Sequence, residues 1–147
     1  MFGNVTPTRS ERTSITPVSY DVHLMRFRDG DAVPAESSLI RHLIETAWQA
    51  PPDEFEYCRV RRGADEGDLY GFGTGESFDG LMFNHAGEEI YKLMYDIALA
   101  ADLVIVPPDG GPFLVREGQR HDLPKDQVGS AVVAKSGADL IRAVESA

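Results

Sequence analysis

Apolar residues recur along the chain at two spacings, and these spacings predict the order of strands and helices. Every second residue of 18–28 shares a face, which predicts a strand. Because both faces carry apolar groups, we expect that strand to lie inside a sheet. Residues 29–31, Asp-Gly-Asp, then predict a turn.

Three stretches instead repeat their apolar residues every three to four positions, which is the spacing of one helix face. They are residues 36–49, 88–101 and 137–147. Pro51 and Pro52 have no N–H to donate, so they predict a sharp end to the first helix.

The remaining apolar runs are short and bounded by turn residues, as is typical of strands. They lie at 55–62, 68–74, 81–83, 103–106, 113–116, 119–123 and 131–134. The first two predict a hairpin, and those at 103–106, 113–116 and 119–123 predict a three-strand meander. This order favours an α+β fold, with a mostly antiparallel sheet, two main helices packed on one face and a short C-terminal helix.

The length of 147 residues suits one domain with a single core. Residues 1–17 are rich in Thr, Ser, Pro and Arg, which predicts a flexible N-terminal tail. Residues 18–147 then form the single α+β domain, and we find no internal repeat in them.

One loop first resembles a ligand site, because an apolar run leads straight into Pro-Pro-Asp-Gly-Gly at 107–111. In α/β ligand crevices a helix follows such a loop, whereas here the apolar run 113–116 follows. We therefore expect a hairpin tip, and each of its residues suits a turn. If the tip has a function, contact with another protein is the expectation.

Charge narrows the classes of partner. The chain carries 24 acidic and 14 basic residues, a net charge of −10, which disfavours nucleic acid and anionic membranes. A basic partner protein is the natural complement, although acidity can also serve solubility alone. Residues 53–79 hold eight acids and three arginines. The acids expected at the interface are Asp65, Glu66, Asp68 and, at the hairpin tip, Asp109.

Three features bear on compartment. No apolar run approaches the roughly 20 residues of a membrane span, and the first 17 residues lack the apolar stretch of a secretory signal. The single cysteine, Cys58, has no internal partner for a disulfide and is interpreted as a small buried hydrophobe. We expect a cytoplasmic protein.

An enzyme is the alternative. Asp21 and His23 share the expected first strand and His85 precedes the second helix, so the three could form a pocket for acid–base chemistry. Spacings typical of a metal site, a nucleophile elbow or a calcium loop are missing, so we expect neither metal nor cofactor.

Two further groups have competing interpretations. The glycines of residues 71–75 could cradle a phosphate, but no helix or lysine follows them, which favours a bulged strand. Arg116 and Arg120 could hold a small anion if the two hairpins were neighbours, or they could neutralise nearby acids.

These observations favour a small acidic, non-catalytic binding protein, of the inhibitor or antidote and immunity type, that covers a basic surface of a partner protein. A small-molecule enzyme with a His/Asp pocket stays open as the alternative. The oligomeric state is open as well.

Overall fold

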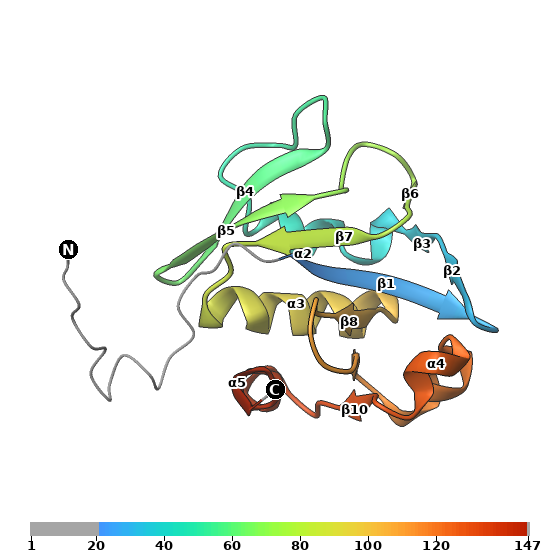
Figure 1. The fold of residues 1–147 in the computed structure, drawn as a ribbon. Helices are drawn as coiled ribbons and strands as arrows, with labels where there is room; N and C mark the ends of the chain where they lie inside the picture. Colours follow the sequence, from blue (N-terminus) through green and yellow to red (C-terminus); the bar gives the residue numbers. More distant parts are fainter. Residues whose placement is uncertain (1–20, 147) are drawn as a thin grey trace, which may run out of the picture.

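The main sheet of the protein has the strand order β10-β9-β8-β1-β7-β5-β4, and β2 pairs with β1 outside this path (Figure 1). We describe residues 21–146 of a computed structural model. The strands of this sheet are β1 (Val22–Arg28), β2 (Asp31–Val33), β4 (Tyr57–Arg62), β5 (Asp65–Tyr70), β7 (Leu81–Asn84), β8 (Val104–Val106), β9 (Phe113–Leu114) and β10 (Val132–Val133). Two short strands, β3 (Ala35–Glu36) and β6 (Ser77–Phe78), form a second sheet.

The helices of the described residues are short, except for α3 and α5. The helices are η1 (Ser37–Leu39), α2 (Arg41–Glu45), α3 (Glu88–Ala101), η2 (Glu117–Asp122), α4 (Lys125–Val128) and α5 (Gly137–Ser146). Helix α3 has the bounds that the apolar spacing predicts, and the fold is α+β with a mostly antiparallel sheet, as expected.

Strand β1 is central, because β7 and β8 pair with it on its two sides, both antiparallel. Val22 and Leu24 are buried, as the alternation predicts. The prediction of an interior strand is confirmed for 22–28, while residues 18–20 and the predicted tail lie outside the described residues.

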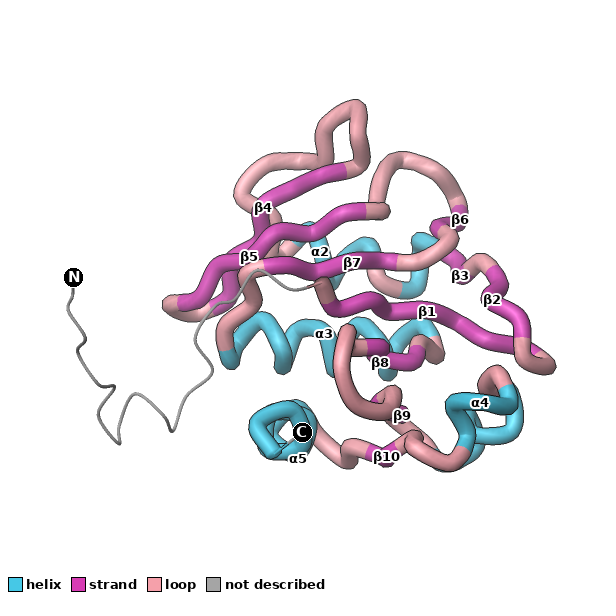
Figure 2. Tube along the Cα trace, viewed as in Figure 1, coloured by secondary structure: helices cyan, strands magenta, loops and turns pink. Residues whose placement is uncertain are grey.

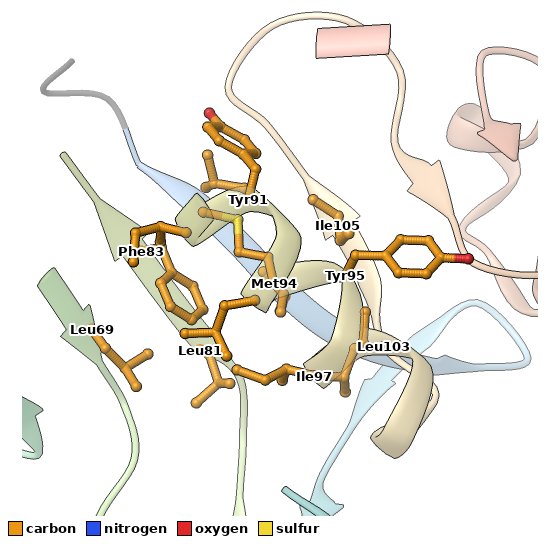
Figure 3. Close-up of a cluster of buried hydrophobic side chains, with 14 of the residues drawn as sticks. Leu69, Leu81, Phe83, Tyr91, Met94, Tyr95, Ile97, Leu103 and Ile105 are labelled. Atoms are coloured by element: carbon orange, nitrogen blue, oxygen red, sulfur yellow. The ribbon is translucent and has the colours of Figure 1, made fainter. Parts of the chain in front are cut away.

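The main core lies between the sheet and α3, which packs against β1, β4, β5 and β8 and is flanked by α2 and α5. Leu81 and Phe83 from β7 meet Met94 and Ile97 from α3 (Figure 3), and all four are at most 1% exposed. Burial of such side chains contributes about 2 kcal/mol each.

The opposite face of the sheet is covered at one end only, within the described residues. There a small apolar cluster joins Val104, Leu114, Leu123 and Ala131. The face over β4, β5 and β7 instead carries polar side chains and the half-exposed Tyr70.

The predicted helix at 36–49 is wrong in length. After η1, the backbone of Ile40 leaves the helical region, and α2 ends at Glu45. Residues 47–49 then pair with β4, because Arg61 donates its N–H to Ala47 and Gln49 donates to Arg59. Pairing with a strand edge therefore outweighs the helical spacing.

The predicted strand at 119–123 is also wrong, because residues 119–122 lie in η2 and the three-strand meander does not form. Gln119 donates to the carbonyl of Leu103 and accepts from the N–H of Val115. These side-chain hydrogen bonds attach the segment to the backbone of residues 103 and 115, so it needs no strand pairing to stay in place. Strand β10 instead pairs with β9 in parallel.

The two hairpin predictions are confirmed with shifted bounds. Strands β8 and β9 pair antiparallel, so residues 107–112 form the hairpin loop. The β4–β5 turn is tighter than expected, because Arg62 pairs with Asp65 and only Gly63 and Ala64 lie between them. Asp65 and Glu66 therefore lie in a strand and not in an exposed turn.

In residues 21–146, no helix has both the length and the apolar character that a membrane crossing requires.

Candidate functional site

The β4–β5 hairpin carries a cluster of polar side chains around Asp68, which is 8% exposed. Its Oδ1 accepts hydrogen bonds from the Tyr57 hydroxyl at 2.7 Å and from Arg59 Nη1 at 3.0 Å. Its Oδ2 lies 2.9 Å from His85 Nδ1. Three neighbouring side chains thus satisfy this buried carboxylate.

These contacts change the pKa values of Asp68 and Tyr57 in opposite directions. Burial alone would raise the pKa of Asp68, but the hydrogen bonds from Tyr57 and His85 and the charge of Arg59 outweigh burial and lower that pKa. The hydrogen bond to Asp68 in turn raises the pKa of Tyr57. Asp68 is therefore ionised at neutral pH and Tyr57 is protonated.

His85 reaches this cluster with a left-handed backbone, at φ 59°. Such a conformation is uncommon outside glycine and costs on the order of 1 kcal/mol or more. The imidazole is half-exposed and lines an open pocket of about 550 Å³ together with Arg59 and Asp68.

The other acids of the hairpin also have partners within the protein. Glu66 accepts from Arg59 Nε at 2.8 Å and lies 3.7 Å from Arg61 Nη2. The hydrogen bond from Arg59 lowers the pKa of Glu66. Asp65 Oδ2 accepts the N–H of Glu89 at 2.7 Å and so caps the first turn of α3.

Asp21, His23 and His85 each have a different neighbour among the described residues. Asn84 Nδ2 donates to Asp21, and His85 bonds to Asp68. His23 lies opposite Met82 in the β1–β7 pair. Within residues 21–146, no cluster of three or more His, Cys, Asp or Glu side chains could hold a metal ion.

Arg116 and Arg120 are both engaged by carboxylates of the chain. Arg116 Nη1 pairs with Asp102 at 2.6 Å, and Arg120 binds both oxygens of Glu117. Both arginines follow the β8–β9 hairpin, and strands β1 and β7 separate that hairpin from β4–β5, so the two hairpins are not neighbours. This geometry favours neutralisation over an anion site.

The glycine-rich segment 71–75 presents two backbone carbonyls to the guanidinium of Arg41. Arg41 Nη2 donates to the carbonyls of Gly73 at 3.1 Å and Gly75 at 3.2 Å, and its guanidinium lies 4.7 Å from the Phe72 ring centroid. At Gly71, φ is +99° and a Cβ would lie 2.5 Å from the carbonyl oxygen of Gly80. These glycines serve packing and a cation contact, which does not support a phosphate loop.

Seven exposed acids lie on two adjacent segments, 36–56 and 71–79, whose loops are the uppermost segments in Figure 2. We call them the acidic loop surface. They are Glu36, Glu45, Asp53, Glu54, Glu56, Glu76 and Asp79. Within residues 21–146 none of the seven takes part in an ion pair, and Arg41 is the one Lys or Arg in the two segments.

The two segments are held together by backbone bonds. Ser37 donates its N–H to the carbonyl of Glu76, and Gly71 donates to Glu56. The β3–β6 pair joins them as well. This pairing could not be read from the sequence, because β3 and β6 have two residues each.

Phe55 projects from the acidic loop surface and is 78% exposed. The turn that carries it is ordered: Asp53 Oδ1 accepts the N–H of Phe55 at 2.8 Å and of Tyr57 at 3.1 Å. Glu56 completes the turn with a left-handed backbone, at φ 61°. The sequence analysis missed the exposure of Phe55, because it predicts that a strand begins at this residue.

Two other residues have simple surroundings. Asp109 is exposed in the β8–β9 loop, where its expected contact with a partner stays a prediction.

Cys58 is buried, and burial together with the charge of Asp53 raises the pKa of its thiol to about 11, so the thiol stays protonated at neutral pH.

Searches against protein-family models, curated proteins and solved structures find no match for this chain.

Proposed function

We propose that this protein is a non-catalytic binding protein whose acidic loop surface covers a basic surface of a partner protein, as an inhibitor or antidote does. The observation that carries the proposal is the distribution of charge. The 30 residues of segments 36–56 and 71–79 have seven acids and one arginine, a net charge of −6. The other 96 described residues have sixteen acids and eleven bases, a net charge of −5.

Uncompensated charge of one sign raises the folding cost through self-repulsion and speeds encounter with a partner of the opposite sign. The ion pairs of the described residues compensate acids elsewhere, for example Glu66 and Asp102, but none of those on this surface. A basic partner would supply the missing counter-charge.

Phe55 supports the same conclusion. Exposed aromatic side chains are enriched among the residues that dominate binding energy, and an ordered loop loses little entropy on association. The bonds that Asp53 accepts hold the turn in one conformation. An exposed aromatic side chain whose neighbours in the chain are Glu54 and Glu56 fits an apolar pocket within a basic surface.

The test begins with affinity purification from the native cell at low and at high salt. Proteins retained only at low salt are identified and purified, and their affinity is measured by calorimetry over a series of salt concentrations. We expect a basic partner whose affinity falls at least tenfold between about 50 and 200 mM salt. Absence of any such partner, or affinity that does not change with salt, would overturn the proposal.

A small-molecule enzyme is the second candidate, and one observation favours it. The buried carboxylate of Asp68 orients the half-exposed imidazole of His85 beside an open pocket, an arrangement that suits a general base. A screen of small polar molecules by thermal shift tests it. A ligand that raises the Tm of the wild type and not of a folded His85→Ala variant supports an enzyme, and a screen without one counts against it.

A further inference from the structure

A groove of about 380 Å³ lies on the face of the sheet that α3 does not cover, over β1, β5 and β7. Leu81 and Phe83 point toward α3, so Met82 between them points to the opposite face. Met82 lines the groove together with Met25 and Tyr70. The groove therefore has a mainly apolar lining and is open to solvent in the described part of the chain.

The groove is part of a row of side chains that crosses five strands. Cross-strand partners share one face of a sheet. The registers place in this row Tyr57, Tyr70, Met82, His23 and Val106. None of the five is buried, and Tyr70 is 38% exposed. Exposed apolar surface that includes methionine is typical of a contact surface, because Met side chains adapt to what they cover.

One carboxylate among the lining residues has no counter-charge. Asp79 is exposed and lines the groove, and no ion pair of residues 21–146 includes it. An occupant with an apolar side chain and a nearby cation would match both the methionines and this carboxylate.

We propose that residues 9–18 of this chain cover the groove, with Ile15 between Met25 and Met82 and Arg12 paired with Asp79. These residues precede the described part of the chain, and their sequence, RSERTSITPV, provides both the apolar group and the cation. The inference goes beyond the proposed function, because it involves no partner protein.

The segment is attached next to the groove. The described chain begins at Asp21, two residues before His23, which also lines the groove. The chain from Ile15 to Asp21 extends to at most about 20 Å, and Met25 lies about 13 Å from Asp21 along β1. Pro17 suits a reversal of chain direction between them. Because α3 packs on the other face of the sheet, the groove face is the one open to this segment.

Charge and attachment favour this segment over a second copy of the protein. Residues 1–20 carry Arg9, Glu11 and Arg12, a net charge of +1. Residues 21–146 carry 23 acids and 12 bases, a net charge of −11, so two copies repel each other. A short tether also keeps the attached segment at an effective concentration in the millimolar range.

Paramagnetic broadening in the full chain tests the contact. A nitroxide is attached at position 13 of a Thr13→Cys variant, and Cys58 does not react because it is buried and protonated. In the ¹⁵N-labelled protein, we expect the strongest broadening at the amides of residues 23–25 and 79–82. We expect weak broadening at 137–146, because α5 packs against α3. Broadening that is weak everywhere, or equal in the two regions, would overturn the inference.

Substitutions on both sides locate the contact. Ile15→Asp in the segment and Met82→Glu in the groove are each expected to remove the broadening at 79–82. The matched controls, Val5→Asp and Leu99→Glu, place the same charge at apolar residues outside the contact and should leave the broadening unchanged. Thermal unfolding checks that each variant folds. Broadening that survives either Ile15→Asp or Met82→Glu in a folded protein would contradict the contact.

A mixed sample distinguishes the segment of the same molecule from that of a second copy. Protein with the nitroxide and without ¹⁵N is mixed with an equal amount of ¹⁵N-labelled protein without the nitroxide. We expect no broadening at 79–82 in this mixture. Broadening there would show that a second copy covers the groove, and the inference would be wrong.

Discussion

The β4–β5 hairpin and the acidic loop surface are neighbours in the chain, but they differ in how their carboxylates are compensated. The carboxylates of the hairpin are bound by donors of the protein, whereas those of the acidic loop surface have no ion-pair partner among the described residues. Residues 57–70 contain three acids and three arginines, so the net charge of the hairpin is zero. Segments 36–56 and 71–79 flank it in sequence and carry a net charge of −6.

The hairpin acids act within the protein. Asp65 caps α3, Glu66 pairs with Arg59, and Asp68 is enclosed by donors. The loop acids are exposed and have no cationic partner in the described residues. The comparison teaches that an acidic sequence segment says little about an interface until its ion pairs are known.

The largest effect is expected at the centre of the hairpin. Asp68→Asn removes the acceptor charge that Tyr57, Arg59 and His85 share, and we expect a loss of about 3 kcal/mol in the free energy of unfolding at neutral pH. Urea unfolding of both proteins measures it. A loss as small as that of Asp79→Asn, an exposed acid without an ion pair, would contradict the structural role of Asp68.

The same variant has a pH signature. The fold lowers the pKa of Asp68, so its contribution is complete above the unfolded value of about 3.9 and is lost as the pH falls through the lower folded pKa. The difference in stability between wild type and Asp68→Asn should therefore shrink below about pH 4. A difference that stays constant down to pH 2 would show that this carboxylate is not the cause.

The next effect concerns binding and not stability. Phe55→Ala should weaken partner affinity at least tenfold, about 1.4 kcal/mol or more, because it removes an exposed aromatic anchor. Its Tm should stay within about 2 °C of the wild type. Leu99→Ala, another exposed apolar side chain, is the control and should leave affinity unchanged.

A smaller effect is expected at the helix cap. Asp65→Asn weakens the charged bond to the N–H of Glu89, and a cap of this kind contributes about 1 kcal/mol. We expect Tm to fall by about 4 °C in thermal unfolding, with partner affinity unchanged. A loss of affinity without a loss of Tm would support the prediction from the sequence that Asp65 contacts the partner.

The smallest effect on stability is expected in the loops. Asp53→Asn/Glu54→Gln/Glu56→Gln removes like charges and keeps the side-chain oxygen of residue 53, so Tm should change by less than about 2 °C or rise slightly. A clear fall in Tm would mean that these carboxylates support the fold.

Much of the fold was predictable, because apolar spacing governs the elements that face the core. The bounds of α3 and the interior position of β1 follow from that spacing. The errors lie where other bonds compete with it. Residues 47–49 pair with a strand edge, and Gln119 bonds to the backbone of Leu103.

The site was less predictable for a related reason. The negative charge of 53–79 was visible, but its compensation depends on cross-strand pairs such as Arg59 with Asp68. A turn expected at 63–67 is only two residues long, which moves Asp65 and Glu66 into β5. The exposure of Phe55 depends on an Asp53 turn that no apolar pattern signals.

The most direct test of the central claim is the affinity of the purified partner for two variants that lose equal charge. Asp53→Asn/Glu54→Gln/Glu56→Gln changes the acidic loop surface, and Asp31→Asn/Asp126→Asn/Glu145→Gln changes exposed acids elsewhere. We expect the first to lose at least tenfold in affinity and the second less than threefold. Equal losses in the two variants would show that net charge, and not this surface, determines binding.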